Sequence, residues 1–191
     1  AGQKQQNANA KYLDVTKPIE VIGENGAWAR ILPSSKLEIS LKIDFEDSGI
    51  GQQVIDYSFS PSIYISGIAA ARTFCMLRDV ENMQRAGYAQ GGSLENALVV
   101  DNGVVLNDGG LRMDNECVRH KVLDCLGDLY LVGMPIRGRI EAELPGHALT
   151  VKLVNALVSD KQSYQIKTLS DNRNINSGYL QFPKMAAAVS A

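Results

Sequence analysis

The stretch VRHKVLDCLGD, residues 118–128, combines the spacing of an amphipathic helix with side chains that can bind a metal ion. Residues three and four positions apart share one face of a helix, so His120, Asp124 and Asp128 line up along the same side. Apolar side chains recur on a different stripe at the helical period. That stripe consists of Val118, Val122, Cys125 and Leu129. We therefore predict a helix over residues 114–131 that packs its apolar stripe on a sheet and presents an imidazole and two carboxylates on another face.

The polar face of this helix has two interpretations. A histidine and an aspartate four residues apart can bind one metal ion together, although this is a weaker signal than an H-E-x-x-H motif. Single histidines and acidic residues are also common on ordinary helix surfaces. Arg119 and Lys121 flank His120, and they are either exposed charges or a site for a phosphate group near the helix N-terminus. The spacing alone leaves these alternatives open.

The composition argues against several classes of function. With 191 residues, 45% of them hydrophobic, the chain can fill one core, with or without a small subdomain. The net charge is −2 and no segment is densely basic, so no nucleic-acid partner is expected. No apolar run approaches the ~20 residues that a transmembrane segment requires. Residues 1–10 are polar and lack the pattern of a signal peptide, and we expect a linker or N-terminal extension there.

The cysteines indicate a reducing compartment. Cys75, Cys117 and Cys125 are odd in number and follow no repeated spacing, which argues against a disulfide framework. Cys117 and Cys125 would lie about 12 Å apart along the predicted helix, beyond the ~7 Å between Cα atoms that a disulfide can span. We expect reduced thiols in a cytoplasmic protein, with Cys125 in the core.

The first third of the chain is predicted to form strands. Residues 11–22 look extended with an interruption at Pro18, and a Gly-containing turn at residues 23–26 indicates a hairpin between residues 19–22 and 27–32. Residues 37–45 alternate apolar and polar side chains without a break, and a second turn leads to a strand over residues 52–58. We predict that these strands form an antiparallel meander.

The rest of the chain mixes helices with strands. A helix over residues 61–72 is followed by a short strand, a helix over residues 79–86 ended by Gly87, and a strand ending at Asp101, which together indicate a βαβ unit. After the central helix we expect a strand over residues 136–143, a helix from His147 to about residue 157, and a strand over residues 164–169. The predicted fold class is α+β, a two-layer sandwich of a mixed or antiparallel sheet packed on helices, with a βαβ insert.

Several segments together resemble one enzyme family. The segments ARTF (71–74), LRDV (77–80) and GGSLENA (91–97) are similar to its middle part. RHKVLD (119–124) with GDLYL (127–131) resembles its metal-binding helix, and GHAL (146–149) resembles its catalytic-histidine turn. The family is that of UDP-3-O-acyl-N-acetylglucosamine deacetylase, a zinc amidase, or hydrolase, of lipid A biosynthesis. The resemblance extends over nearly the whole chain, from about residue 11 onward.

The resemblance implies a role for each polar residue of the site. His120 and Asp124 would be zinc ligands, with Fe(II) as the alternative metal. His147 would be the general acid and Asp128 would hold its imidazole in place. Thr73 would donate a hydrogen bond to the oxyanion or to the metal-bound water.

The resemblance also implies where the substrate, UDP-3-O-acyl-N-acetylglucosamine, would bind. Lys121 would meet its diphosphate or sugar, and Phe74 would pack on the sugar. The insert at about residues 73–101 would form a hydrophobic passage for the acyl chain. The residues that would line or shape this passage are Val80, Ala89, Gly92, Ser93 and Ala97.

The chain departs from the family in one large respect. In the family a preceding domain of similar architecture supplies a third zinc ligand, a histidine, next to the glutamate that acts as general base, and no Glu-His dipeptide occurs in this sequence. The resemblance thus implies that residues 11–191 are the second, C-terminal domain, that its partner is the missing N-terminal domain, and that this chain alone is close to inactive. Two alternatives stay open, a non-catalytic module that binds an acyl chain or nucleotide sugar, and a zinc or iron hydrolase site completed by self-association.

Overall fold

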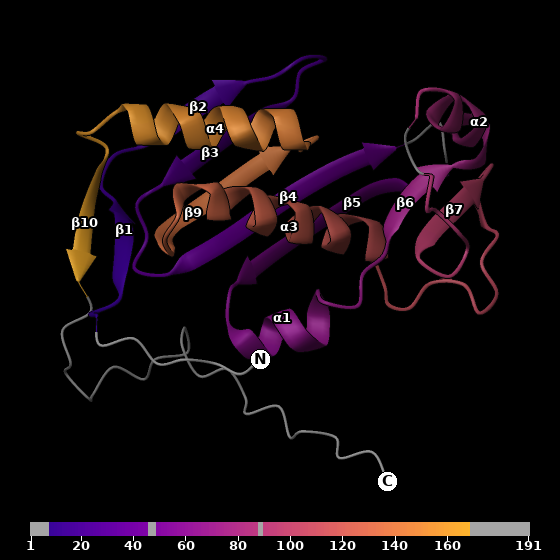
Figure 1. Ribbon diagram of the computed structural model, residues 1–191, viewed down its shortest axis with the longest axis horizontal. Coiled ribbons are helices and arrows are strands. Elements are labelled where there is room, and N and C mark those ends of the chain that lie inside the picture. Colours follow the sequence, from indigo (N-terminus) through magenta and orange to yellow (C-terminus); the bar gives the residue numbers. More distant parts are fainter. Residues whose placement is uncertain (1–7, 46–48, 88–89, 169–191) are drawn as a thin grey trace, which may run out of the picture.

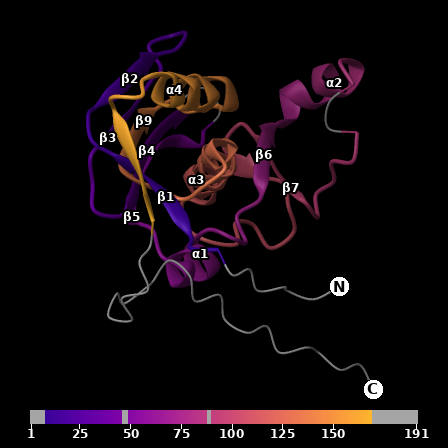
Figure 2. The same cartoon turned by 60° about the vertical axis from the view of Figure 1, so that its left-hand side comes forward.

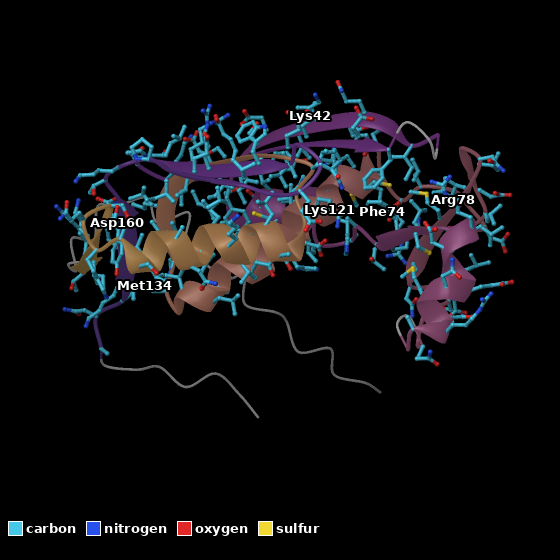
Figure 3. The ribbon with its side chains drawn as sticks, turned by 90° about the horizontal axis from the view of Figure 1, so that it is seen from above. Lys42, Phe74, Arg78, Lys121, Met134 and Asp160 are labelled. Atoms are coloured by element: carbon cyan, nitrogen blue, oxygen red, sulfur yellow. The ribbon has the colours of Figure 1, made fainter. Side chains whose placement is uncertain are left out.

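The computed structural model describes residues 8–45, 49–87 and 90–168. Two helices, α3 (Glu116–Leu129) and α4 (His147–Ser159), lie side by side across one face of a seven-stranded sheet (Figure 1). Seen from above, the sheet forms one layer and the helices the other (Figure 3). The predicted α+β sandwich of two layers is therefore confirmed.

The strands fall into two sheets. The large sheet contains β1 (Lys11–Val15), β2 (Ile19–Ile22), β3 (Trp28–Leu32), β4 (Leu37–Phe45), β5 (Gly51–Ser58), β9 (Ile136–Glu143) and β10 (Tyr164–Thr168). The small sheet contains β6 (Thr73–Met76), β7 (Ala97–Asp101) and β8 (Val104–Val105). The remaining helices are α1 (Pro61–Gly67), α2 (Leu77–Arg85) and the 3₁₀ turn η2 (Tyr130–Val132).

Strand β9 is the centre of the large sheet. It pairs with β4 in parallel along one edge, and with β1 and then β3 along the other edge. The hairpins β2–β3 and β4–β5 form as predicted. The predicted meander is wrong, however, because β9 lies between β3 and β4 although it comes much later in the chain. Turn residues reveal only local pairing, and this pairing is not local.

The alternation along β9 separates core from solvent. Its residues are alternately buried and half-buried. On the outward face, Nε of Arg139 lies 2.7 Å from Oε1 of Glu141, in an ion pair along the strand. The inward faces of the sheet meet the apolar stripe of α3, where Val118, Val122, Cys125 and Leu129 are all buried, as the sequence predicts. Each fully buried Val or Leu contributes about 1.5–3 kcal/mol to folding. This packing fixes the polar face of α3 relative to the sheet.

The βαβ insert is confirmed as a separate small unit. Strands β6 and β7 are parallel, α2 connects them, and the insert stands beside the sandwich at the end where α3 begins (Figure 2).

Helix α1 ends at Gly67, five residues before the predicted end at residue 72, and the backbone N–H groups of Ile68 and Ala69 both donate to the Tyr64 carbonyl oxygen. None of the helices within the described ranges is both long and apolar enough to cross a membrane.

Candidate metal centre and active site

His120 and Asp124 form the centre of the polar face of α3. The Nε2 atom of His120 lies 3.2 Å from Oδ1 of Asp124, and the side chains of His120 and Asp124 are 14% and 16% exposed, respectively. The other ring nitrogen of His120, Nδ1, lies 3.2 Å from the carbonyl oxygen of Ala71 in the segment before β6. A carbonyl only accepts hydrogen bonds, so this contact favours a proton on Nδ1 and leaves Nε2 as the nitrogen that faces Asp124.

The distance between these two atoms suits a shared metal ion. Zinc binds imidazole nitrogen at about 2.0–2.1 Å and carboxylate oxygen at about 2.0–2.2 Å, so two tetrahedral ligand atoms lie about 3.4 Å apart. The observed 3.2 Å between Nε2 of His120 and Oδ1 of Asp124 is close to that value. The chemistry of the pair, one imidazole and one carboxylate, also fits zinc or iron. These two residues therefore fit two positions of a metal site.

The described residues supply only part of such a site. Within residues 8–45, 49–87 and 90–168, no group of three or more His, Cys, Asp or Glu side chains is placed to hold a metal ion. The cysteines of α3 are no substitute, because burial raises the pKa values of Cys117 and Cys125 to about 12 and keeps both thiols protonated. Cys125 is a core residue, as predicted.

His147 joins the same cluster from α4. It is the first residue of α4, and its Nδ1 atom lies 3.0 and 3.1 Å from the two carboxylate oxygens of Asp128. Its Nε2 atom lies 4.0 Å from Oδ1 of Asp124. The side chain of His147 is 67% exposed, whereas those of Asp128 and Asp124 are 15% and 16% exposed. A half-buried carboxylate thus orients a solvent-accessible imidazole beside the His120–Asp124 pair.

Positive charge keeps Asp124 ionised. Burial by itself raises the pKa of Asp124, but the hydrogen bond and charge of His120, together with those of Lys121, outweigh burial and hold the pKa below its ordinary value. The Nζ atom of Lys121 lies 3.2 Å from Oδ2 of Asp124. Asp124 is therefore a carboxylate at neutral pH, as a metal ligand has to be.

Lys121 also connects the polar cluster to an aromatic surface. Its Nζ atom lies 5.6 Å from the centre of the Phe74 ring, and Figure 3 shows the two side chains next to each other. Phe74 packs edge-on against Phe45 of β4, with 5.3 Å between the ring centres. Thr73 precedes Phe74 at the start of β6, and its side chain is exposed. The start of the insert thus lies beside the polar face of α3.

The other residues assigned to the acyl passage are spread over the insert. Ala97 is buried and pairs with Thr73 across the β6–β7 ladder, so it belongs to the end of the insert nearest the site. Val80 lies half-buried on α2, and Gly92 and Ser93 are exposed in the loop before β7. Ala89 lies outside the described residues. The structure therefore places Ala97 beside Thr73 at the start of the insert, Val80 on α2, and Gly92 and Ser93 in the loop before β7.

The buried ion pair of Arg72 and Glu116 was not predicted from the sequence. Their side chains are 6% and 0% exposed, and Nε of Arg72 lies 2.8 Å from Oε1 of Glu116. Burial works to raise the pKa of Glu116, but the hydrogen bonds and charge of Arg72, with a backbone bond from Arg112, hold it below its ordinary value. Little in the sequence indicates this buried pair, because an acidic residue at the start of a helix is usually exposed and interacts with the helix dipole.

Comparison with known proteins identifies the family. A sequence profile described as "UDP-3-O-acyl N-acetylglycosamine deacetylase" matches residues 1–159. Proteins named UDP-3-O-acyl-N-acetylglucosamine deacetylase from Histophilus somni and Psychrobacter arcticus are 40% and 41% identical to this chain over 182 residues, which is 94% of the chain. The chain spans 59% and 57% of those two relatives, so it corresponds to only part of their length. By the profile match and these identities, the chain belongs to the UDP-3-O-acyl-N-acetylglucosamine deacetylase family.

Proposed function

We propose that this chain is the C-terminal part of a zinc-dependent deacetylase, comprising residues 11–191 after a linker or extension at residues 1–10. The enzyme removes the N-acetyl group from UDP-3-O-acyl-N-acetylglucosamine in lipid A biosynthesis, in the cytoplasm. The observation that carries the proposal is the distance of 3.2 Å between Nε2 of His120 and Oδ1 of Asp124, with Nε2 of His147 only 4.0 Å from the same oxygen. Two potential ligands and a potential acid thus converge from two helices.

In this proposal His120 and Asp124 hold the metal, zinc or alternatively Fe(II). When bound, such an ion polarises the amide carbonyl and makes a water molecule acidic enough to lose a proton near neutral pH. Catalytic zinc usually has three protein ligands. The third ligand and the general base therefore come from a second domain, which the relatives' greater length can accommodate.

His147 acts as the general acid. The carboxylate of Asp128 accepts a hydrogen bond from Nδ1–H and holds the imidazole ring in place. Nε2 is then the atom that gives a proton to the departing amine as the C–N bond breaks. Thr73 donates its hydroxyl proton in a hydrogen bond to the negative charge that develops on the carbonyl oxygen.

The surface around this cluster holds the substrate. Lys121 binds the diphosphate or the sugar with its ammonium group, and Phe74 packs its ring against the sugar. The acyl chain follows the insert along a passage lined or shaped by Val80, Ala89, Gly92, Ser93 and Ala97. The exposed apolar surface of the insert supports this role, since Leu77 on α2 and Leu94 in the loop before β7 are 43% and 51% exposed.

The proposal is tested by adding to the chain the portion of the enzyme that would supply the third ligand and the general base. Zinc content, particle size and acetate release are measured for the 191-residue chain, first alone and then with the portion of the Histophilus somni relative that it does not cover. We expect almost no acetate release from the chain alone and release on addition of the missing portion. Robust release by the monomeric chain alone would contradict the two-domain assignment.

The same measurements decide between the alternatives. A dimer with stoichiometric metal and activity of its own would support a site completed by self-association. Binding of the nucleotide sugar without any acetate release, even after addition of the missing portion, would support a non-catalytic binding module. Loss of zinc from His120→Ala and Asp124→Asn in the completed protein would support the ligand assignment, and normal zinc content in both variants would overturn it.

A further inference from the structure

One peptide group connects Glu116 with His120. The N–H group of Arg72 donates a hydrogen bond to Oε1 of Glu116 at 3.0 Å, and the carbonyl oxygen of Ala71 lies 3.2 Å from Nδ1 of His120. That N–H and that carbonyl belong to the same planar amide, between residues 71 and 72. Glu116 and His120 are one helical turn apart on α3, so this amide spans the turn and contacts both side chains.

The carboxylate of Glu116 is held rigidly by several hydrogen bonds. Besides the Arg72 N–H, Glu116 accepts hydrogen bonds from Nε and Nη2 of Arg72 at 2.8 and 3.0 Å and from the Arg112 N–H at 2.7 Å. Its side chain is fully buried. A second bond from Nη2 of Arg72 to the Gly110 carbonyl fixes the guanidinium in turn. The amide therefore cannot rotate away from His120 without breaking a buried, charge-assisted hydrogen bond.

The charge of Glu116 also strengthens the contact with His120. A carboxylate bonded to an amide N–H polarises that amide and makes its carbonyl oxygen a better acceptor, as in other chains of hydrogen bonds. A better acceptor at Ala71 favours the proton on Nδ1 of His120. Nε2, which faces Oδ1 of Asp124, is then the nitrogen that is left to bind a metal ion. Groups that fix the tautomer and ring orientation of a ligand histidine control how well it binds its metal.

We propose that Glu116 is a positioning residue for His120, acting through the amide between Ala71 and Arg72. It touches neither metal nor substrate. The proposal rests on the proposed function only in so far as His120 binds the metal, because the hydrogen bonds themselves join only groups of this chain. The same buried carboxylate binds Arg72, the residue just before β6, and so connects the ligand helix to the insert.

Glu116→Gln tests this role in the 191-residue chain. Glutamine has the same shape, but its NH₂ group must face two of the four N–H donors that the carboxylate accepts. We expect Zn²⁺ affinity, measured by competition with a chelating dye, to fall roughly 10- to 100-fold. In the metal-free chain, NMR should show faster solvent exchange of the proton on Nδ1 of His120. Glu141→Gln is the matched control, because Glu141 also binds arginines but lies on β9 and is bonded to Arg30 and Arg139. It should change neither quantity.

A further variant separates positioning from stability. Arg72→Lys keeps the backbone N–H that bonds Glu116 but weakens the buried ion pair, so it should lower the unfolding temperature and leave the exchange of the His120 proton slow. Equal acceleration of exchange in Arg72→Lys and Glu116→Gln would overturn the proposal in favour of a purely structural pair. Wild-type affinity and exchange in folded Glu116→Gln would overturn it as well. If the wild-type chain binds no Zn²⁺ in isolation or after completion, the ligand assignment fails, and the exchange measurement alone decides the role of Glu116.

Discussion

The Nδ1 atom of His147 lies 3.0 Å from Oδ2 of Asp128, although the two residues are 19 positions apart and belong to different helices. The contact forms because the first residue of α4, His147, lies beside the last turn of α3, which contains Asp128. It turns the other ring nitrogen, Nε2, toward Asp124. The orientation of an imidazole that is 67% exposed thus depends on the packing of two helices.

The first prediction concerns His147→Ala in the protein completed with the missing portion of a relative. We expect kcat for acetate release to fall by about 10²–10⁴, the usual contribution of a general acid. Zinc content should not change, because His147 is not a ligand in the proposed site. A loss of zinc as large as that in His120→Ala would show that His147 is a ligand and not the acid.

The second prediction concerns Asp128→Asn, which keeps the shape of the side chain and removes its charge. We expect kcat to fall, but by no more than in His147→Ala, because Asp128 acts only through the imidazole. The double variant should then be no slower than His147→Ala alone, since residues that act as a unit are not additive. Independent, multiplicative effects of the two substitutions would contradict this coupling.

The sequence predicted what depends on local pattern. The stripe of α3, the alternation of β4 and β9 and the start of α4 at His147 all follow from side-chain period and turn residues. The position of His147 beside Asp128 could not be read from the pattern and entered only through the family resemblance. Helix α3 and helix α4 meet because both pack on the same sheet, and that sheet is assembled around β9 by pairing that no local signal reveals.

The buried Arg72–Glu116 pair could not be predicted for a related reason. Arg72 lies just before β6 and Glu116 begins α3, and their separation in sequence gives no hint of contact. A charge is buried only when its partners are already in place, and those partners come from the loops around residues 110–112. Periodicity identifies apolar cores, but it carries no information about which charged residues are enclosed in them.

The third prediction is a dependence of stability on pH. The pKa of Glu116 lies below its ordinary value of 4.5 in the folded chain, so its ionised form stabilises the fold above about pH 4.5, and this contribution is lost as the pH falls through the folded pKa. Arg72→Met should therefore lower the free energy of unfolding by about 3–5 kcal/mol at pH 7, and by less near pH 4, where Glu116 can be protonated. Urea unfolding at the two pH values measures the difference.

Arg85→Met is the control for this experiment. Arg85 pairs with Glu81 on the surface of α2, where both side chains are more than 70% exposed. Its loss should change stability by about 0.5 kcal/mol or less at either pH. An Arg72→Met effect that is equally small, or that does not depend on pH, would mean that Glu116 is not held as a buried carboxylate.

The fourth prediction concerns the contact between α4 and the sheet. Leu153 is 1% exposed in the core, whereas Leu131 on the turn after α3 is 65% exposed. Leu153→Ala should lower the free energy of unfolding by about 2–5 kcal/mol, since it removes buried surface and leaves a cavity. Leu131→Ala should stay within about 0.5 kcal/mol of the wild type. Similar losses in the two variants would contradict the assignment of this face of α4 to the core.

The last prediction concerns Gly49, in the turn between β4 and β5. Its φ angle is +74°, and a Cβ atom at this position would lie 2.3 Å from the Cα atom of Gly103 in the β7–β8 turn. Gly26 has a similar φ of +79° and open space around it. Gly26→Ala should therefore cost only the left-handed strain of about 1–2 kcal/mol. Gly49→Ala should cost measurably more, because two backbone segments must move apart, and amide exchange in β7 and β8 should accelerate in that variant alone. Equal stability losses and unchanged exchange would mean that the insert does not rest on the β4–β5 turn.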